Sequence, residues 1–498
     1  MRKLTFNMLT SVIYRVAIIL TGLAVQRHIL AAYGSAVNGL TSAVTQMISY
    51  LVLLEAGIGA ATVSALHKPL KENDTDKLSS LLSAGGKMYR KAGIAFLVGS
   101  LITAALLPIF TAGEASPVTV IALTLLSAAV NLVSYLFVGK YTPLLTADGK
   151  IGVIYILDTL STVLSCGGRI LLISLGADIL PVQAVMPICA ALKALAVWLY
   201  VKKSYPLINY KAKPDSELAP RRRSAMVHQI VGLAVSHTDV TILTLFSTLK
   251  TVSLYSVYQY IYSSISALLE TAFCQATLGS MGKAAAEGKE RFNRAFTVLE
   301  SGYNTILYLI LSVALTLTLP FIRLYTAGIQ DVEYVNITVA ILFCLNGFLS
   351  LIRLPSIVAI NCYGAFKETE RGAVIECIIN LSVSLALFPF LGITGLLLGT
   401  TAAYLFRTQD TVRFVYRKCE LSYLDLLRSN IGNLISAALV IIFGFVLFPV
   451  TAESYGEWIL KALVLTVSSA VVFLVTNLIF NRKAFLLAKN ILTKTQKN

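Results

Sequence analysis

Long apolar runs alternate with short polar connections along the whole chain. A helix needs roughly 20 apolar residues to cross the ~30 Å hydrocarbon core of a bilayer, and each run has about that length. About fourteen spans are predicted on this basis, over residues 5–26, 37–62, 92–112, 118–138, 151–175, 182–201, 226–247, 252–280, 300–320, 335–360, 373–391, 394–412, 430–449 and 458–480. The pattern therefore predicts an all-α polytopic membrane protein.

The composition agrees with this pattern and removes the soluble classes. The 498 residues are 56% hydrophobic and 13% charged, with a mean hydropathy of +0.77. An ordinary soluble domain is about 25% charged. A soluble enzyme, a disordered chain and a small secreted protein held by disulfides are all excluded, and no metal cluster or disulfide framework is visible in the sequence.

The net charge of +16 reflects topology. If the connections are assigned alternately to the two sides, nearly all lysines and arginines between the spans fall on one side. The other side holds only Arg27, Lys250 and Arg323. Since cytoplasmic loops carry such an excess, we expect a multi-pass protein of the cell membrane with both termini cytoplasmic. Topology accounts for the cations, so nucleic acid is not expected as a partner.

The chain divides at its longest inside connection, the basic loop 202–225. We expect an N-lobe over residues 1–201 with spans one to six, and a C-lobe over 226–415 with spans seven to twelve. Spans thirteen and fourteen and a basic cytoplasmic tail follow in 416–498. An offset of about 216 residues relates the first hairpin of each lobe, which predicts two pseudo-symmetric six-helix lobes around a midplane cavity.

The outside connections are too short to hold a catalytic loop or domain, so an enzyme is not predicted. No phosphate-binding loop for ATP is present, and no cofactor is expected. An enzyme of membrane polysaccharide assembly is the alternative from another class, and it would require a long outer loop.

Ionisable side chains at membrane depth are functional candidates, because they are costly unless they are paired or face water. Ser11, Arg15 and Gln26 share a polar face with Asn7 on the first span, within an arc of about 100°. We expect this face to line a wet, substrate-binding cavity, with structural pairing of Arg15 as the alternative. Arg169 on span five, with Arg353 on span ten, could extend a cationic cavity.

On the seventh span, His237 is a candidate for substrate binding or proton coupling, since an imidazole titrates near neutral pH. Asp239 faces another side of that helix and is either a second coupling residue or an anchor for a neighbouring helix. Glu55 and Glu270 occupy corresponding inner ends of spans two and eight. We expect these two acids to support a gate or hinge.

Other polar residues have structural interpretations. Asp158 and Lys193 are potential partners of each other, and Arg407 and Asp410 are three residues apart, as in a local ion pair. Pro355 is expected to kink span ten. A stripe of aromatic rings is predicted to form a membrane-interface belt, with stacking on sugars as the alternative; it consists of Tyr255, Tyr258 and Tyr262.

Three stretches carry a family resemblance. YGSAVNGLTSAVTQMISYLVLLEAGIGAATVSAL (33–66) resembles the first helical hairpin of polysaccharide flippases. The acidic-Gly-x-Gly element near the end of that hairpin corresponds here to Glu55-Ala56-Gly57-Ile58-Gly59, in which the acidic residue is followed by Ala. HTDVTILTLFSTLKTVSLYSVYQYI (237–261) is similar to their seventh-to-eighth helix junction, and LPFIRLYTAGIQDVEYVN (319–336) to their ninth-to-tenth connection. The chain thus resembles the Wzx-type lipid-linked oligosaccharide flippases of the multidrug/oligosaccharidyl-lipid/polysaccharide (MOP) superfamily.

The resemblance implies fourteen spans in two lobes and a flippase activity. Such a protein moves an undecaprenyl-diphosphate-linked oligosaccharide from the inner to the outer leaflet by alternating access, for cell-surface polysaccharide assembly. Its partners would be membrane lipids and the glycosyltransferases and polymerase of the same pathway. A lipid II flippase is the first alternative. A cation-coupled multidrug exporter is the second, although such exporters usually have twelve spans and an acidic residue in the first helix, where this chain has Arg15.

Overall fold

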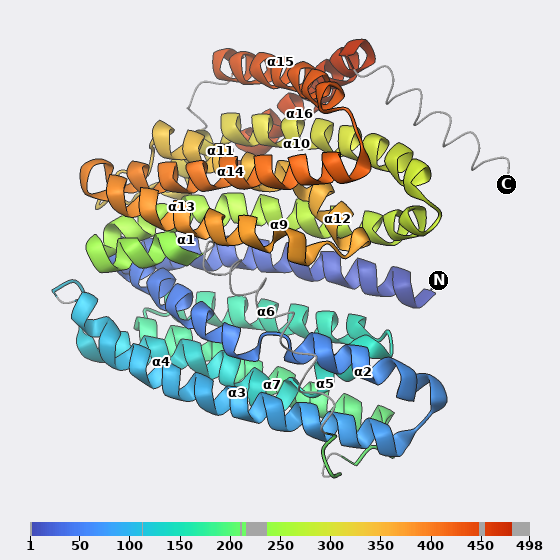
Figure 1. The fold of residues 1–498 in the computed structure, drawn as a ribbon. Coiled ribbons are helices and arrows are strands. Elements are labelled where there is room, and N and C mark those ends of the chain that lie inside the picture. The colour runs from blue at the N-terminus through green and yellow to red at the C-terminus, as the bar shows by residue number, and fades with distance from the viewer. Residues whose placement is uncertain (1, 112, 210–211, 216–236, 448–453, 481–498) are drawn as a thin grey trace. The chain divides into compact units, whose positions relative to one another are not determined.

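The structure is a computed structural model of the whole chain, and it describes all residues except 1, 112, 210–211, 216–236, 448–453 and 481–498 (Figure 1). Within the described residues every regular element is helical. Ten of these helices are long and apolar enough to cross a membrane. The predicted fold class, an all-α polytopic membrane protein, is therefore confirmed.

The difference between ten helices and fourteen predicted spans has local causes. The candidate over Thr5–Glu72 contains the first two predicted spans. The helices α9 (Leu249–Ala286) and α14 (Ile393–Cys419) coincide with predicted spans eight and twelve, but their apolar stretches are more polar than those of the ten candidates. Part of predicted span seven, 226–236, lies outside the described residues, and 237–246 is helical.

The described chain forms two compact units, Met1–Val257 and Tyr258–Asn498. The division falls within α9. The predicted lobe boundary in loop 202–225 stays a prediction, because 210–211 and 216–225 lie outside the described residues. The predicted basic tail, 481–498, lies outside them as well.

The first unit begins with α1 (Arg2–Leu51), which contains the first predicted span and the first part of the second and is bent at Gly34. This residue has φ +81°, in the left-handed region that glycine adopts without a steric penalty. The short 3₁₀ turn η1 (Val52–Glu55) and helix α2 (Ile58–Glu72) follow.

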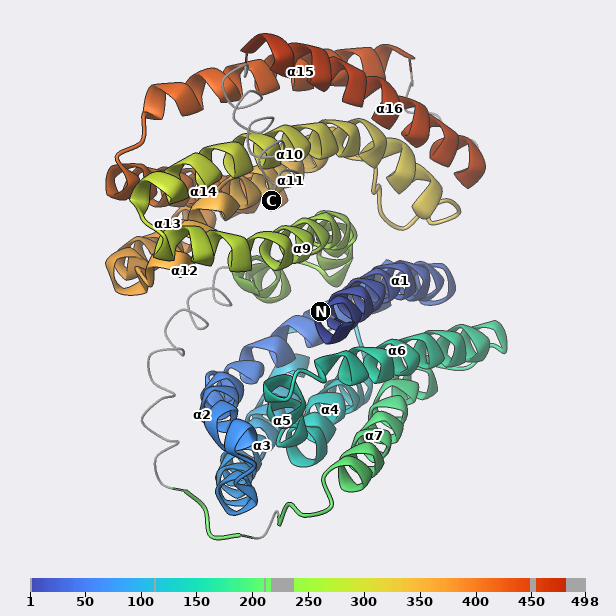
Figure 2. The same cartoon turned by 90° about the vertical axis from the view of Figure 1, so that its right-hand side faces the viewer.

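The remaining helices of the first unit pack on one another, and α3, α4 and α6 also pack on α1 (Figure 2). They are α3 (Thr75–Phe110), α4 (Pro117–Val133) with the π turn η2 (Ser134–Val138), α5 (Tyr141–Ala147), α6 (Ile151–Ser174) and α7 (Ile179–Ser204). Helix α6 packs on both α1 and α7, and α4 packs on both α3 and α7. Helix α1 therefore lies beside α6, the helix that carries Arg169, and Asn7 at the start of its polar face contacts the start of α6.

The second unit contains the C-terminal part of α9 and seven further helices. These are α10 (Lys289–Tyr325), α11 (Ile337–Ile352), α12 (Leu354–Tyr363), α13 (Phe366–Leu391), α14, α15 (Tyr423–Leu447) and α16 (Tyr455–Phe480). The break at Arg353 between α11 and α12, with Pro355 in the first turn of α12, confirms the predicted kink.

Helices α15 and α16 lie along α10 (Figures 1 and 2). Side-chain amides join the three helices: Asn304 on α10 donates to Asn430 (3.3 Å), and Asn477 on α16 donates to Asn433 on α15 (3.0 Å). Thr305 on α10 contacts both Asn433 and Asn477. Because helices in lipid gain little from apolar contact alone, such hydrogen bonds help to fix the last two spans on the bundle.

Candidate functional site

The polar face of α1 makes hydrogen bonds with other segments of the protein at both of its ends. At the inner end as predicted, the Asn7 amide donates to the Gly149 carbonyl (2.9 Å) and accepts from the Gly152 N–H (3.0 Å). At the other end, Gln26 donates to the Ser256 hydroxyl (3.3 Å). Both residues fix neighbouring segments, so these ends of the face are structural as well as polar.

Between these ends the face includes Ser11 and Arg15. Ser11 is 6% exposed and donates to the Met8 carbonyl of its own helix (2.9 Å), a local bond that the sequence does not distinguish from an exposed hydroxyl. Arg15 is half-buried and makes no hydrogen bond or salt bridge with the part of the chain that the structure describes. Its guanidinium is therefore available to a ligand.

An acidic side chain close to this face is already neutralised. Asp158 on α6 lies within electrostatic range of Tyr14, the neighbour of Arg15. It binds Lys193 on α7 through a salt bridge of 2.8 Å, in which both side chains are less than one-fifth exposed. The predicted Asp158–Lys193 pair is thus confirmed. Because Lys193 occupies this carboxylate, the charge of Arg15 remains uncompensated.

Arg169 adds a second cation that has no acidic partner among the described residues. Its guanidinium donates to the Gln183 side-chain oxygen at 3.0 Å, and Gln183 is 6% exposed. A neutral amide orients the guanidinium but leaves its positive charge. The first unit therefore holds two half-buried arginines, Arg15 and Arg169, whose charge is not balanced by a carboxylate.

Residues 237–257 pack against α1 by polar contacts, by one close backbone approach and by Leu249, which joins an apolar cluster that includes α1 residues. The Asn38 amide donates to the Ser253 hydroxyl at 2.7 Å, and Tyr50 shares a hydrogen bond of 3.0 Å with Thr241. A Cβ on Gly39 would lie 1.8 Å from the Leu249 carbonyl oxygen, so only glycine permits this approach. These contacts join residues 237–257 to the part of α1 that follows the bend at Gly34.

His237 and Asp239 take part in this packing. His237 contacts the Gln46 side-chain oxygen through Nδ1 and meets the Tyr50 ring edge-on at 5.7 Å between centroids. Asp239 is 5% exposed and accepts from the Tyr255 hydroxyl at 2.8 Å. Asp239 thus anchors the helical segment 237–246 to α9, which is the alternative role expected for it. The coupling role of His237 and of Asp239 stays a prediction.

The prediction of a membrane-interface belt at Tyr255, Tyr258 and Tyr262 is wrong. All three are at most 4% exposed. The hydroxyl of Tyr258 donates to the Tyr334 carbonyl (2.7 Å), and that of Tyr262 shares a hydrogen bond with Thr318 (3.0 Å). Each tyrosine ring is buried within the protein, and its hydroxyl is hydrogen-bonded to another protein group. The helical spacing of the three tyrosines is the same whether they face protein or lipid, so it could not distinguish the two cases.

Arg353 belongs to a buried ion-pair cluster in the second unit. It binds Glu376 on α13 at 2.8 Å, and Arg407 on α14 contacts the other oxygen of Glu376 at 3.4 Å. Arg407 also binds Asp410 at 2.8 Å, which confirms the predicted local pair. Two cations face two acids, so the cluster carries no net charge. Arg353 fixes the α11–α12 break to α13 and α14 and adds no free charge to a cavity.

Glu376 was not among the predicted site residues, although an acidic residue within the apolar span 373–391 was a signal for it.

Glu55, the last residue of η1, is half-buried near Tyr89 and Tyr135, and Glu270 is exposed on α9. Neither acid has a hydrogen-bond or ion-pair partner among the described residues. Their gate or hinge role stays a prediction. Over the described residues, no group of three or more His, Cys, Asp or Glu is arranged to hold a metal ion.

Comparison with known proteins gives neither a matching family model nor a matching curated relative. Several solved structures share the fold. The lipid II flippase MurJ, in an inward closed conformation, superposes with a TM-score of 0.69 at 15% identity, covering 95% of this chain and 99% of that one. An inward-facing multidrug resistance MATE family transporter of the MOP superfamily gives 0.63 at 13% identity over 82% and 98%. The eukaryotic MATE transporter AtDTX14 gives 0.56 at 14% identity over 83% and 95%. The chain therefore has the fold of the MOP-superfamily transporters.

Proposed function

We propose that this protein is a flippase that moves an undecaprenyl-diphosphate-linked oligosaccharide from the inner to the outer leaflet for cell-surface polysaccharide assembly. The carrying observation is Arg15: a half-buried guanidinium in the middle of the first span that has no partner among the residues that the structure describes. A cation at that depth costs about 2.5–3.5 kcal/mol on insertion scales. A purely structural arginine would be expected to have an acidic partner, as Arg353 has in Glu376.

The diphosphate supplies the missing negative charge. A guanidinium donates two parallel hydrogen bonds to phosphate oxygens, and these charge-assisted bonds are stronger where water is excluded. Arg169, oriented by the neutral Gln183, provides a second donor in the same unit. The polyprenyl tail stays in the bilayer, because burying it in a polar cavity would forgo its transfer free energy.

Alternating access requires contacts that can form and break without loss of the fold. The Asn38–Ser253 hydrogen bond and the Gly39–Leu249 approach are the contacts that we expect to break, since one is a single hydrogen bond and the other is a backbone contact. The predicted topology places the bend at Gly34, which shortly precedes Asn38 and Gly39, on the outer side. We infer that these contacts close the outer side of the cavity before the substrate is released there.

The charge pattern and the fold favour a flippase over the other candidates. Unpaired arginines attract an anionic lipid diphosphate and repel a cationic drug. The match to the lipid II flippase covers 95% of the chain, whereas the two MATE structures cover 82% and 83% of it. Lipid II carries the same diphosphate, so lipid II flipping is the second candidate. The structural similarity to transporters and the short predicted outside connections both support the proposal that the protein is a transporter and not an enzyme.

The test is flipping in proteoliposomes that contain a labelled lipid-diphosphate oligosaccharide, with a lectin or oxidant that reaches only the outer leaflet. Protein-dependent exposure of that substrate, without exposure of lipid II, is expected. Exposure of lipid II alone would replace the proposal with the second candidate. Absence of both activities in folded protein, under imposed proton gradients and membrane potentials, would contradict a lipid-diphosphate flippase.

A further inference from the structure

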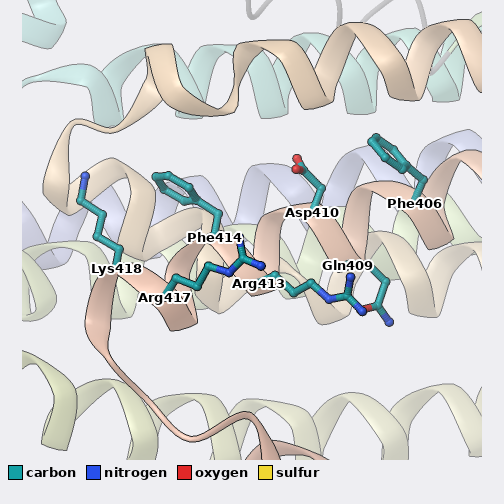
Figure 3. A pocket seen from close by; sticks show the side chains of 7 residues that line it. All are labelled: Phe406, Gln409, Asp410, Arg413, Phe414, Arg417 and Lys418. Atoms are coloured by element: carbon teal, nitrogen blue, oxygen red, sulfur yellow. The ribbon is translucent and has the colours of Figure 1, made fainter.

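A pocket of about 640 Å³ lies at the C-terminal end of α14, and none of its lining residues is assigned to flipping (Figure 3). One row of its lining residues is polar and repeats every four positions: Gln409, Arg413 and Arg417. Figure 3 shows these three side chains side by side along the helix. The other row contains two rings, Phe406 and Phe414, with Asp410 and Lys418.

The charged members of the second row are already paired. Asp410 binds Arg407 at 2.8 Å, and Lys418 binds Glu368 at 3.5 Å. Lys418 also lies 5.5 Å above the Phe414 ring centroid. These residues form a neutral, partly aromatic wall.

Arg413 and Arg417 differ from the other cations around them. Both are exposed, and neither has a hydrogen bond or salt bridge to any residue that the structure describes. Like charges four residues apart on a helix repel each other. The pair therefore leaves two guanidinium groups on one side of a pocket with no protein anion to balance them.

The position of the pocket defines the kind of molecule that fits. Predicted span twelve ends at residue 412, so Arg413 is the first residue beyond that span. Phe406 and the exposed Leu405 lie within the span. A ligand here would place an anionic group on the arginines and apolar chains along the rings, which is the form of an anionic phospholipid at the membrane surface.

We propose that the α14 pocket binds an anionic glycerophospholipid, with Arg413 and Arg417 donating to the phosphate oxygens and Phe406 and Phe414 contacting its apolar part. The guanidinium geometry suits a phosphate better than a lysine would. The site is separate from Arg15 and does not depend on the proposed flipping activity.

The experiment measures binding of phosphatidylglycerol and phosphatidylcholine to the purified full-length protein in detergent, by native mass spectrometry. The test variant is Arg413→Gln with Arg417→Gln. About 1 kcal/mol for each arginine near a membrane surface corresponds to about 30-fold weaker phosphatidylglycerol binding. Phosphatidylcholine binding is expected to stay unchanged. The double Arg→Lys variant retains the charge and is expected to bind more tightly than the double Gln variant.

A matched control distinguishes specific lipid binding in the α14 pocket from a general effect of positive surface charge on lipid binding. Arg291 and Arg294 on α10 are also exposed and also near a predicted inner helix end, but each pairs with a glutamate four residues earlier, Glu287 and Glu290. Their double Gln variant is expected to bind phosphatidylglycerol as the wild type does.

Three results would overturn the proposal. One is unchanged phosphatidylglycerol binding by the folded Arg413→Gln, Arg417→Gln variant. Another is an equal loss in the Arg291→Gln, Arg294→Gln control, which would assign the effect to overall charge. The third is displacement of phosphatidylglycerol by a polyprenyl diphosphate oligosaccharide at much lower concentration, which would assign the pocket to a transported lipid.

Discussion

Replacing Gly39 with alanine tests whether the contact between α1 and the start of α9 controls opening. The new Cβ would lie 1.8 Å from the Leu249 carbonyl oxygen and 2.7 Å from its carbonyl carbon. A carbon and a carbonyl oxygen normally lie about 3.3 Å or more apart. Since the obstructing atoms are backbone, no side-chain rotation relieves the overlap, and the two segments must separate by more than about 1 Å.

The size of the effect follows from the cost of overpacking. Inserting a methyl group into a well-packed contact costs about 1–3 kcal/mol. If this cost falls on the closed arrangement alone, the equilibrium shifts toward opening by about 5- to 150-fold. The fold as a whole is expected to survive, because the strain is relieved in the open arrangement.

Cysteine labelling measures this shift. Ser253 is 0% exposed, so a Ser253→Cys reporter, in a background without the seven native cysteines, should react slowly with a membrane-impermeant maleimide. Gly39→Ala should accelerate labelling at least about five-fold, the lower end of the range above. Gly167→Ala on α6 is the matched control, because no atom lies within 4 Å of the Cβ that it would add.

The reasoning is refuted if Gly39→Ala labels at the same rate as Gly167→Ala while the protein remains folded. A lower Tm without faster labelling would also refute it, since the contact would then stabilise the unit without governing access to Ser253.

Three further predictions follow from the packing. Glu376→Gln leaves two buried arginines without their shared acid and should destabilise the protein by about 3–5 kcal/mol, seen as a lower Tm; an unchanged Tm would show that the cluster is not buried as described. Cysteines at positions 38 and 253, where the native side chains are 2.7 Å apart, should form a disulfide that stops transport until a reductant is added; transport by the oxidised protein would exclude opening at this contact. His237→Gln should flatten any dependence of transport on pH between about 5 and 8, the range in which histidine changes charge; the same pH profile in wild type and variant would remove His237 from coupling.

The fold was predictable from the sequence because bilayer thickness fixes the length of each apolar run. The same logic located the break at Pro355, since proline cannot continue a helical hydrogen-bond pattern. Ion pairs between residues close in sequence or on consecutive spans, such as Arg407–Asp410 and Asp158–Lys193, could also be predicted from the sequence.

Contacts between distant segments were not predictable from pattern alone. Arg353 was expected to add charge to a cavity, but Glu376, 23 residues later, neutralises it. Tyr258 was expected at a membrane surface, but it packs inside protein and reaches the Tyr334 carbonyl. In both cases the helical face was visible in the sequence, whereas the identity of the facing element depends on tertiary packing.

The most direct test of the central claim is the flipping rate of Arg15→Gln and Arg15→Lys in the proteoliposome assay, with Tm and reconstituted amount matched to wild type. The account predicts that Arg15→Gln loses outer-leaflet exposure of the lipid-diphosphate oligosaccharide, and that Arg15→Lys retains part of it because the charge remains. Wild-type flipping by folded Arg15→Gln would contradict the assignment of Arg15 to the diphosphate.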